Sequence, residues 1–548
     1  MISRFKYFAA FTAVFAVCAV WLFWGTWSPD FVPVMPDCGW NYPNAFSEHL
    51  ANWWRGWVAG GNFVPDDLKA FLGSPWLWSE LQYALALYCA ALGLAYFLSG
   101  RGLPPLAAYG AGLLLAFCGY WCTLFSAGHL GWFRWMTYGV FAFGLIDRAV
   151  LGDRLRHWLM LGACVAWASF YQPDLWLIFT LFTAIYFLYR CVRERRLPWK
   201  GALFALLAFA LIGAPSFYNA FHNALAGRKE QIAQAEGEKK VEKEGGGGEK
   251  GEDDAQWIFA TNWSLPPAEI AEFFLPRLNG DTSCVLTQAL SAKAGHDIRP
   301  YTGALGRAKD AKSGNYRQHS LYVGFITCLL ALFALARRYR EVDVVFFAAA
   351  ATTFLVFSLG RFCEPVYRLV YALPFGDYLR APVKWHHLTE FCLCVLAGYG
   401  IAELYGMLSK TKLKPAVVTA ITAAVVLLGV ANLVNDDHRY CAPVDMRQAK
   451  AKDADMQFNF LHRSQFSNPQ VSAMVKAGLV QSLAYFPGNR DVYLVGILTP
   501  RKHERVPTPP WSLATWLGLV SVLSSLLVAV LVVGACRSAV GAKLRVMG

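Results

Sequence analysis

Residues 415–435 read PAVVTAITAAVVLLGVANLVN, and this stretch decides the class of the fold. It carries no charged side chain over its whole length, and an α-helix of about 20 such residues crosses a bilayer. Lys410, Lys412 and Lys414 stand directly before it, so basic residues mark one end of the apolar run. We therefore expect a membrane-spanning helix here.

Similar apolar runs recur from one end of the chain to the other. The composition agrees, because 56% of the 548 residues are hydrophobic and only 16% are charged, against about 25% in soluble domains. The sequence therefore predicts an all-α polytopic membrane protein with about 12 transmembrane helices and long extracytoplasmic loops. The predicted spans are 7–27, 76–98, 104–126, 131–147, 155–172, 174–192, 200–220, 318–336, 342–360, 386–406, 415–435 and 511–535.

Lys and Arg cluster in alternate connections between these runs, and this alternation predicts the topology. The short basic connections should be cytoplasmic, together with both termini, and the longer connections 28–75, 221–317, 361–385 and 436–510 should face outward. The formal charge of +13 lies in these short clusters rather than on one soluble face, so we expect no nucleic-acid partner. The basic residues are Arg101, Arg148, Arg154, Arg156, Arg190, Arg193, Arg195, Arg196, Lys200, Arg337, Arg338, Arg340, Lys410, Lys412, Lys414, Arg537, Lys543 and Arg545.

Three regions follow from this topology. Residues 1–435 form the transmembrane domain, including a charged, glycine-rich insertion at 228–256 that cannot bury a core and should be flexible. Residues 436–510 form a small extracytoplasmic lid or cap, with helical patterning over Met456–Leu483 and a strand over Val492–Leu498. Residues 511–548 form the last span and a cytoplasmic tail.

The first outer loop holds a candidate acidic residue near the membrane surface. Asp37 lies between Pro36 and Cys38, and an amphipathic stretch with Trp53 and Trp57 at helical spacing follows it. Such a stretch lies along a bilayer surface, which would place the carboxylate near lipid head groups. The alternative is that Asp37 caps a turn.

Two tight outer connections and one longer loop carry further polar candidates. His129, and Gln172 with Asp174, would ring the mouth of one cavity, or would simply be solvated helix ends. Arg380 and Lys384 lie among aromatic residues on the side where basic residues are otherwise few. They fit a phosphate near the membrane surface, or alternatively ion pairs with acidic residues of the same loop.

The 14 cysteines show no metal-ligand spacing, and the predicted outer ones, which could oxidise in pairs, are Cys38, Cys284, Cys363 and Cys441. No phosphate-binding loop, HExxH motif or nucleophile elbow is present in the sequence. The residues therefore give no support to nucleotide or metalloprotease chemistry.

Six short motifs follow one another over residues 1–410. They are Pro36-Asp37; Gly128-His129; Gln172-Pro173-Asp174; Ala260-Thr261-Asn262-Trp263-Ser264 with Glu269, Pro276 and Gly280; Leu379-Arg380-Ala381-Pro382-Val383-Lys384; and Leu396-Ala397-Gly398-Tyr399-Gly400. As an ordered set they resemble the YfhO-like family of bacterial membrane proteins, which belongs with the GT-C membrane glycosyltransferases. The family usually has His-Pro-Gln where this chain has Gln172-Pro173-Asp174.

The resemblance implies a GT-C-like fold and a sugar transfer on the outer face of the bacterial inner membrane. The donor would be a polyprenyl-phosphate sugar, and the acceptor a cell-surface glycan or polymer. Asp37 would be the general base, and Arg380 and Lys384 would stabilise the departing lipid phosphate. His129, Gln172, Asp174, Trp263 and Glu269 would bind substrate. No residue is assigned to a metal, although the resemblance leaves a divalent cation open.

Two other classes of protein fit the same number of spans. A transporter or lipid flippase is the main rival, although the sequence shows no internal repeat and no matching pair of broken helices. A non-catalytic envelope-assembly protein on the same fold is the third candidate.

Overall fold

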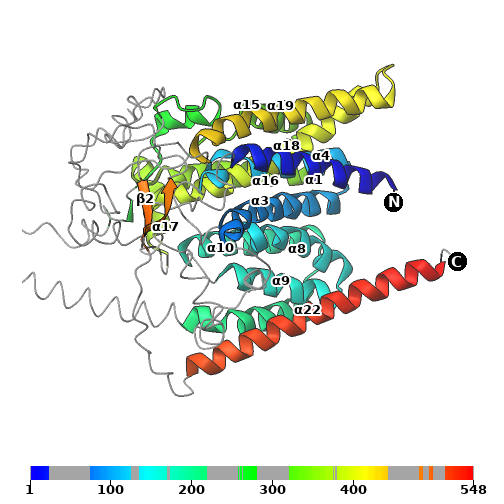
Figure 1. Ribbon diagram of the computed structural model, residues 1–548. Coiled ribbons are helices and arrows are strands. Elements are labelled where there is room, and N and C mark those ends of the chain that lie inside the picture. Colours follow the sequence, from blue (N-terminus) through cyan, green and yellow to red (C-terminus); the bar gives the residue numbers. More distant parts are fainter. Residues whose placement is uncertain are drawn as a thin grey trace, which may run out of the picture.

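The computed structural model describes residues 2–23, 75–124, 135–169, 173–218, 257, 260–261, 263–280, 320–373, 376, 379, 381–441, 480–485, 493–497 and 513–546. Within these ranges the chain is a bundle of long helices that run roughly side by side (Figure 1). The first residues of α1 and the last residues of α22 lie at the same end of the bundle (Figure 1).

The helices follow the apolar runs of the sequence. The first half of the chain contains α1 (Ile2–Leu22), α3 (Pro75–Gly100), α4 (Pro105–Ala116), α5 (Gly119–Cys122), the π-helix η3 (Trp135–Gly139), α8 (Val140–Gly152), α9 (Leu155–Ala168), α10 (Pro173–Arg193) and a helix over Trp199–Tyr218. The second half contains η4 (Pro267–Phe273), α15 (Phe325–Arg338), α16 (Val342–Ser358), η5 (Gly360–Cys363), α17 (Glu364–Tyr371), η7 (Pro382–Trp385), α18 (His386–Ser409), α19 (Pro415–Cys441) and α22 (Leu513–Val546).

Each of the predicted spans contains a helix in the part of the chain that the structure describes. Of these helices, six are long and apolar enough to cross a membrane, or seven if the bent pair of α16 with η5 and α17 counts as one span. The structure therefore shows a helical membrane protein. The six are Phe5–Leu22, Leu81–Gly100, Asp174–Arg193, Trp199–Tyr218, Pro382–Ser409 and Pro415–His438.

Two of the predicted spans are interrupted. The run 104–126 breaks after Ala116, because the amide of Gly119 donates to the carbonyl of Tyr322 (2.8 Å) instead of continuing the helix. The run 342–360 ends at Ser358, and the chain turns by 109° into the short helix that ends at Tyr371. Both breaks arise from contacts with segments that are distant in sequence.

Differences also occur near the predicted lid. Helix α19 continues through Cys441, past the predicted edge at 435. Strand β1 (Val480–Tyr485) pairs antiparallel with β2 (Tyr493–Ile497). Strand β2 lies within the strand predicted over Val492–Leu498. The helical pattern predicted over Met456–Leu483 is wrong at its end, where β1 begins, because the pairing with β2 overrides it. Its other residues lie outside the described ranges, as does the insertion 228–256.

Helix α18 is the centre of the bundle. It packs against α4, α15, α16 and α19, and residues on nearly every face of its first four turns are buried. Because most of its polar side chains lie within those turns, they are enclosed by the surrounding helices.

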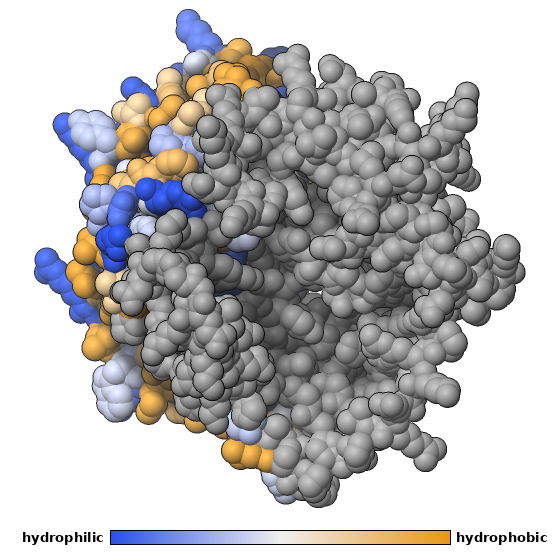
Figure 2. All heavy atoms as spheres, turned by 90° about the vertical axis from the view of Figure 1, so that its left-hand side faces the viewer, coloured by the Kyte–Doolittle hydropathy of each residue, from blue (hydrophilic) through white to orange (hydrophobic). Residues whose placement is uncertain are grey.

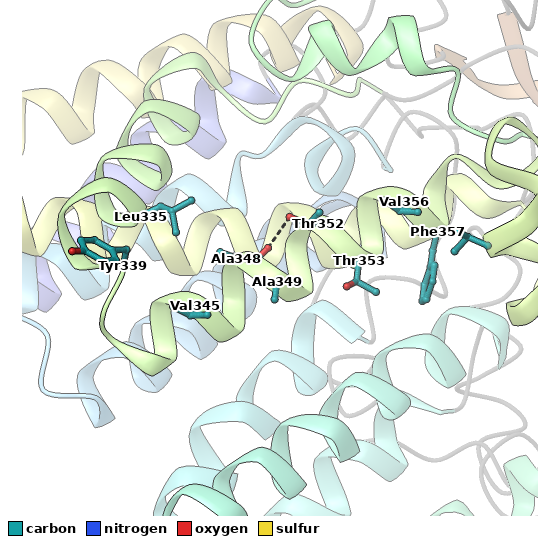
Figure 3. A pocket seen from close by; sticks show the side chains of 10 residues that line it. Leu335, Tyr339, Val345, Ala348, Ala349, Thr352, Thr353, Val356 and Phe357 are labelled. Carbon is teal, nitrogen blue, oxygen red and sulfur yellow. Dashed lines mark hydrogen bonds between the residues drawn. The ribbon is translucent and has the colours of Figure 1, made fainter.

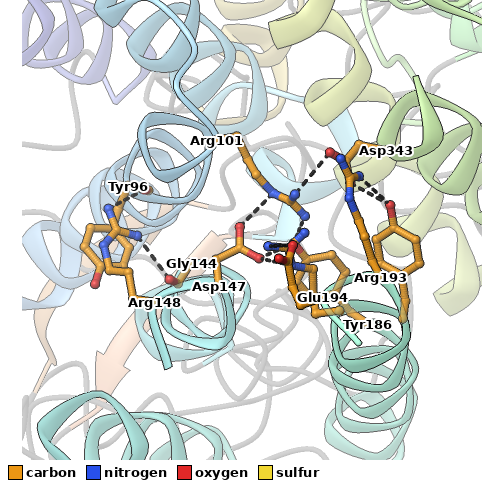
Figure 4. Close-up of polar contacts among 11 residues, drawn as sticks. Tyr96, Arg101, Gly144, Asp147, Arg148, Tyr186, Arg193, Glu194 and Asp343 are labelled. Carbon is orange, nitrogen blue, oxygen red and sulfur yellow. Dashed lines mark hydrogen bonds and ion pairs between the residues drawn. The ribbon is translucent and has the colours of Figure 1, made fainter. Parts of the chain in front are cut away.

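A network of buried charges joins four elements at the end of the bundle that holds both termini (Figure 4). Arg101, between α3 and α4, contacts Asp147 of α8 (2.7 Å) and Asp343 of α16 (3.1 Å). Arg190 of α10 contacts the other oxygen of Asp147 (2.8 Å). Tyr186 also donates to Asp147 (2.7 Å), and the charges of the two arginines and two aspartates cancel. Burial opposes the charge of Arg101, but Tyr186, Asp147 and Asp343 outweigh it and raise the pKa of Arg101.

Ion pairs place further basic connections at the same end. Arg196, after α10, contacts Asp153, between α8 and α9 (2.8 Å). Arg338, at the end of α15, contacts Glu403 in the last turns of α18 (2.9 Å). The alternation of Lys and Arg along the sequence therefore corresponds to one end of the bundle, and we call this the basic end.

Asp147→Ala should destabilise the protein by about 3–5 kcal/mol, because the change leaves two buried guanidinium groups without a shared carboxylate. The control is Glu364→Ala, whose partner Arg368 is 55% exposed and whose loss should cost at most about 1 kcal/mol. Thermal unfolding of both variants in the same detergent measures the difference. Equal unfolding midpoints would contradict a structural role for the buried network.

Candidate functional site

The end of the bundle opposite the basic end carries the candidate site. Helix α10 has Arg190 in its last turn at the basic end, so its first turn, with Asp174, lies at the opposite end. In a view onto that end, the visible described surface mixes hydrophilic and hydrophobic side chains (Figure 2).

Two of the motifs singled out in the sequence pair with each other through their backbones. The amide of Ala381 donates to the carbonyl of Ala260 (3.1 Å), and the amide of Val383 donates to the carbonyl of Trp263 (3.1 Å). The amide of Leu265 donates to Ser358 at the end of α16 (2.8 Å). The described residues of segments 260–265 and 381–384 are therefore joined by backbone hydrogen bonds, and we call this arrangement the crossing. Its contact with Ser358 attaches it to the corner between α16 and α17.

Two residues of this crossing adopt left-handed backbone conformations without being glycine. They are Trp263 (φ 58°) and Ala381 (φ 60°). A left-handed residue other than glycine costs of order 1–3 kcal/mol and persists where its surroundings fix it. Such residues cluster at functional sites, so their presence marks this crossing as a candidate site.

The crossing brings together two of the predicted site residues. Lys384 of η7 donates from its Nζ to Oδ2 of Asp174, which is 210 residues away in sequence. The two side chains are 9% and 12% exposed, so the pair is almost fully buried. The other oxygen of Asp174 accepts from the amide of Leu175 (2.8 Å) in the first turn of α10.

A buried polar cluster lies in the first two turns of α18, directly after η7. Oε1 of Glu390 accepts from the amide of Tyr120 (3.1 Å) and from the thiol of Cys118 (3.2 Å), where the run 104–126 is interrupted. His386 lies 3.5 Å from the same oxygen, and His387 lies 3.8 Å from the other. The interruption of this span therefore provides two hydrogen-bond donors to one oxygen of Glu390, while Oε2 has no hydrogen-bond partner among the described residues.

His386 occupies an unusual position within this cluster. Its side chain is fully buried, and neither ring nitrogen has a hydrogen-bond partner among the described residues. The ring lies between those of Phe273 (4.4 Å between centroids) and Tyr120 (5.5 Å). Glu390 is the nearest charged group that contacts it.

Two carboxylates at the end of α19 extend the buried polar region. Arg277 contacts Asp436 (2.9 Å), and Asp437 is fully buried on the same helix. Sequence reasoning did not select these residues, nor His386, His387 and Glu390. Ionisable side chains at or within an apolar span were the signal that could have identified them.

The other predicted site residues have different outcomes. Trp263 lies in the crossing described above, and Glu269 is buried in the first turn of η4, where it faces protein groups. Cys363 is a free thiol. The described residues contain no group of three or more His, Cys, Asp or Glu side chains arranged to hold a metal ion. The residues that lie outside the described ranges are Asp37, His129, Gln172, Arg380, Cys38 and Cys284.

Comparison of the chain with family models, with curated proteins and with solved structures finds no match. The assignment of a function therefore depends on the site itself and on the motifs of the sequence.

Gly360→Ala should open the crossing. Gly360 has φ +50°, and a Cβ atom there would lie 2.1 Å from Oγ of Ser264 and 2.5 Å from the ring of Pro382. The strain and the clash together should destabilise the protein by about 2–4 kcal/mol. Thermal unfolding measures the loss, and hydrogen exchange at the amides of Leu265 and Arg361 should rise.

The matched control for this change is Gly406→Ala on α18, where nothing lies within 4 Å of the added atom. This variant should be at least as stable as the parent, because alanine favours a helix. If both glycine variants unfold alike, tight packing at the α16–α17 corner is not what holds the crossing together.

Proposed function

We propose that this protein is a GT-C-type membrane glycosyltransferase that moves a sugar from a polyprenyl-phosphate donor to a cell-envelope acceptor. Twelve spans, cytoplasmic termini and a location in the bacterial inner membrane belong to the same proposal. The observation that carries it is the buried ion pair of Lys384 and Asp174 beside the Trp263 turn, at the end opposite the basic connections.

A lipid-linked sugar presents an anionic phosphate at the membrane surface, and its recognition requires a cation at that depth. Lys384 supplies this cation, already desolvated and held in place by the crossing. In the resting state Asp174 neutralises it, which avoids an unpaired buried charge. A phosphate oxygen of the donor would take the place of the carboxylate in a charge-assisted hydrogen bond.

The two left-handed residues near Lys384 support this interpretation. Ala381 precedes the lysine, and Trp263 accepts the amide of its neighbour Val383. Their conformations fix where η7 begins and therefore where the ammonium group lies. A fixed cation stabilises developing negative charge without a further cost of reorganisation.

In the proposed reaction a hydroxyl of the acceptor attacks the anomeric carbon of the sugar. The bond between that carbon and the phosphate oxygen breaks, and polyprenyl phosphate leaves with the electron pair. Asp37 accepts the proton of the hydroxyl. Arg380 and Lys384 stabilise the leaving phosphate, while His129, Gln172 and Glu269 belong to the sugar and acceptor side. The cell-surface glycan or polymer that accepts the sugar is part of this proposal.

A lipid transporter is the second candidate, and one observation favours it. Helix α16 and the short helices that follow it are long and apolar enough to cross a membrane only together, and they are bent by 109°. Broken spans of this kind build the substrate sites of many transporters. A transporter would move the lipid across the bilayer and leave its sugar attached.

The topology is tested by labelling single cysteines from outside intact cells. A cysteine in place of Gly247 should react with an impermeant reagent, and one in place of Arg195 should not, because positive residues are retained in the cytoplasm. The reverse labelling pattern would place the candidate site on the cytoplasmic side and overturn the proposed donor chemistry.

The reaction is tested by sugar transfer in membranes from deletion cells that express each variant. Asp37→Asn should lower transfer by about 10²–10⁴-fold with donor binding unchanged, because the amide cannot accept the proton. Lys384→Met should weaken donor binding, since the cation for the phosphate is removed. Lys412→Met, at an exposed position of the basic end, is the control and should match the parent.

Two results would contradict the proposal. Near-parental transfer by Asp37→Asn would assign the base to another carboxylate. Movement of the lipid-linked sugar across vesicles of purified protein, without transfer to any acceptor, would favour the transporter.

A further inference from the structure

An apolar groove of about 620 Å³ runs along the outside of α16 (Figure 3). Its volume lies within the usual range of about 300–1,000 Å³ for sites that bind small ligands. The groove is formed between α16, the end of α15 and α17. The lining residues are Leu335, Tyr339, Val345, Ala348, Ala349, Thr352, Thr353, Val356, Phe357 and Val366.

The floor of the groove is built from small residues in two rows of helical spacing. Ala348 and Thr352 lie in one row, and Ala349 and Thr353 in the other (Figure 3). The hydroxyl of Thr352 donates to the carbonyl of Ala348 on its own helix (3.0 Å). Because this hydroxyl is already satisfied, a hydrocarbon chain can lie against it without leaving a polar group unpaired.

The groove follows most of the length of α16. Its residues on α16 extend from Val345 to Phe357, which at 1.5 Å per residue is about 18 Å. This is more than half of a hydrocarbon core of about 30 Å, so a single extended chain that enters from the basic end would occupy most of the groove.

Exposed cations lie at that end. Tyr339 closes the groove there, and the guanidinium of Arg340 lies 5.3 Å from the centre of its ring. Arg337 is 54% exposed, and its guanidinium group lies 3.8 Å from the carboxylate of Glu403. Arg338 makes the closer contact with the same carboxylate (2.9 Å). Arg337 and Arg340 are therefore the arginines best placed to meet an anion.

We propose that this groove binds one acyl chain of an anionic phospholipid, with the headgroup phosphate between Arg337 and Arg340. Guanidinium groups bind phosphate oxygens in a bidentate manner, and basic residues beside membrane helices select anionic lipids. The proposed headgroup position lies at the basic end, away from Lys384, and the binding does not depend on the proposed glycosyltransferase activity.

The positive charge at the basic end of the groove favours an anionic phospholipid over a partner helix or a polyprenyl chain. A partner helix would also use the small residues, but it would not need two exposed arginines at one end. A polyprenyl chain could enter from the opposite end, where Phe357 packs on Trp385 (5.1 Å between centroids), the neighbour of Lys384. Each of these occupants gives a different result in the experiment that follows.

Native mass spectrometry of the detergent-solubilised full chain, titrated with phosphatidylglycerol or phosphatidylcholine, tests the proposal. The parent should retain phosphatidylglycerol in preference, and inorganic phosphate should not compete because it has no chain. The double variant Arg337→Ala/Arg340→Ala should bind phosphatidylglycerol about 30-fold more weakly, at about 1 kcal/mol for each lost charge.

Two further variants separate the chain from the headgroup. Ala349→Phe and, as a second choice, Thr353→Phe fill the groove at exposed positions and should weaken the binding of both lipids. The control Lys412→Ala/Lys414→Ala removes the same charge from the exposed connection between α18 and α19 at the same end, and should leave binding unchanged.

Three outcomes would overturn the proposal. The first is equal binding of phosphatidylglycerol by the parent and the double arginine variant. The second is competition by polyprenyl phosphate that survives loss of both arginines, which would assign the groove to that lipid. The third is a dimer that the groove-filling variants dissociate, which would make it a helix interface.

Discussion

The buried contacts among Arg101, Asp147, Arg190 and Asp343 fix the helices on which the rest of the molecule depends. Each aspartate is shared by cations from different elements, so no helix can slide without separating a buried charge from its partner. Two of the joined helices, α10 and α16, also reach the opposite end of the bundle. From Arg190 to Asp174 the distance along α10 is about 24 Å. The network therefore sets the height at which Asp174 and the α16–α17 corner meet η7.

At the opposite end, the buried polar side chains hold a local break in the chain in place and do not fix the positions of whole helices relative to one another. The interruption of the chain before Gly119 leaves the amide of Tyr120 free to donate to Glu390 of α18, and the thiol of Cys118 donates to the same oxygen. A carboxylate at this depth would otherwise be costly to bury. The break in one span is thus the condition under which α18 can carry a charged residue in its second turn. The first turn of the same helix holds His386 against the ring of Phe273 and so connects α18 to η4.

The sequence predicts the helices well and their interruptions poorly. Apolar length is a reliable signal because every backbone group in a bilayer must be paired within its own segment. The break before Gly119 depends instead on Tyr322, and the bend at Gly360 depends on Ser264, so neither can be seen in the local pattern. The motifs placed Trp263, Asp174 and Lys384 in one site, and the structure brings these three together. The polar residues within the predicted span 386–406 escaped notice because their apolar neighbours outnumber them.

The two kinds of buried ion pair differ in what their surroundings contribute. Asp147, Asp343 and Arg190 at the basic end project from regular helices, whose own hydrogen bonds hold these side chains in position, while Arg101 and Asp153 lie in the connections between helices. Lys384 lies instead in a four-residue 3₁₀ turn that follows the left-handed Ala381. Glycine at position 381 would relieve the backbone cost, so the strain is not needed to make a turn. What the strained conformation does provide is a fixed start for η7, and with it a fixed place for the ammonium group. A site that must hold a cation ready for an anionic ligand requires that fixed position, whereas a purely structural ion pair does not.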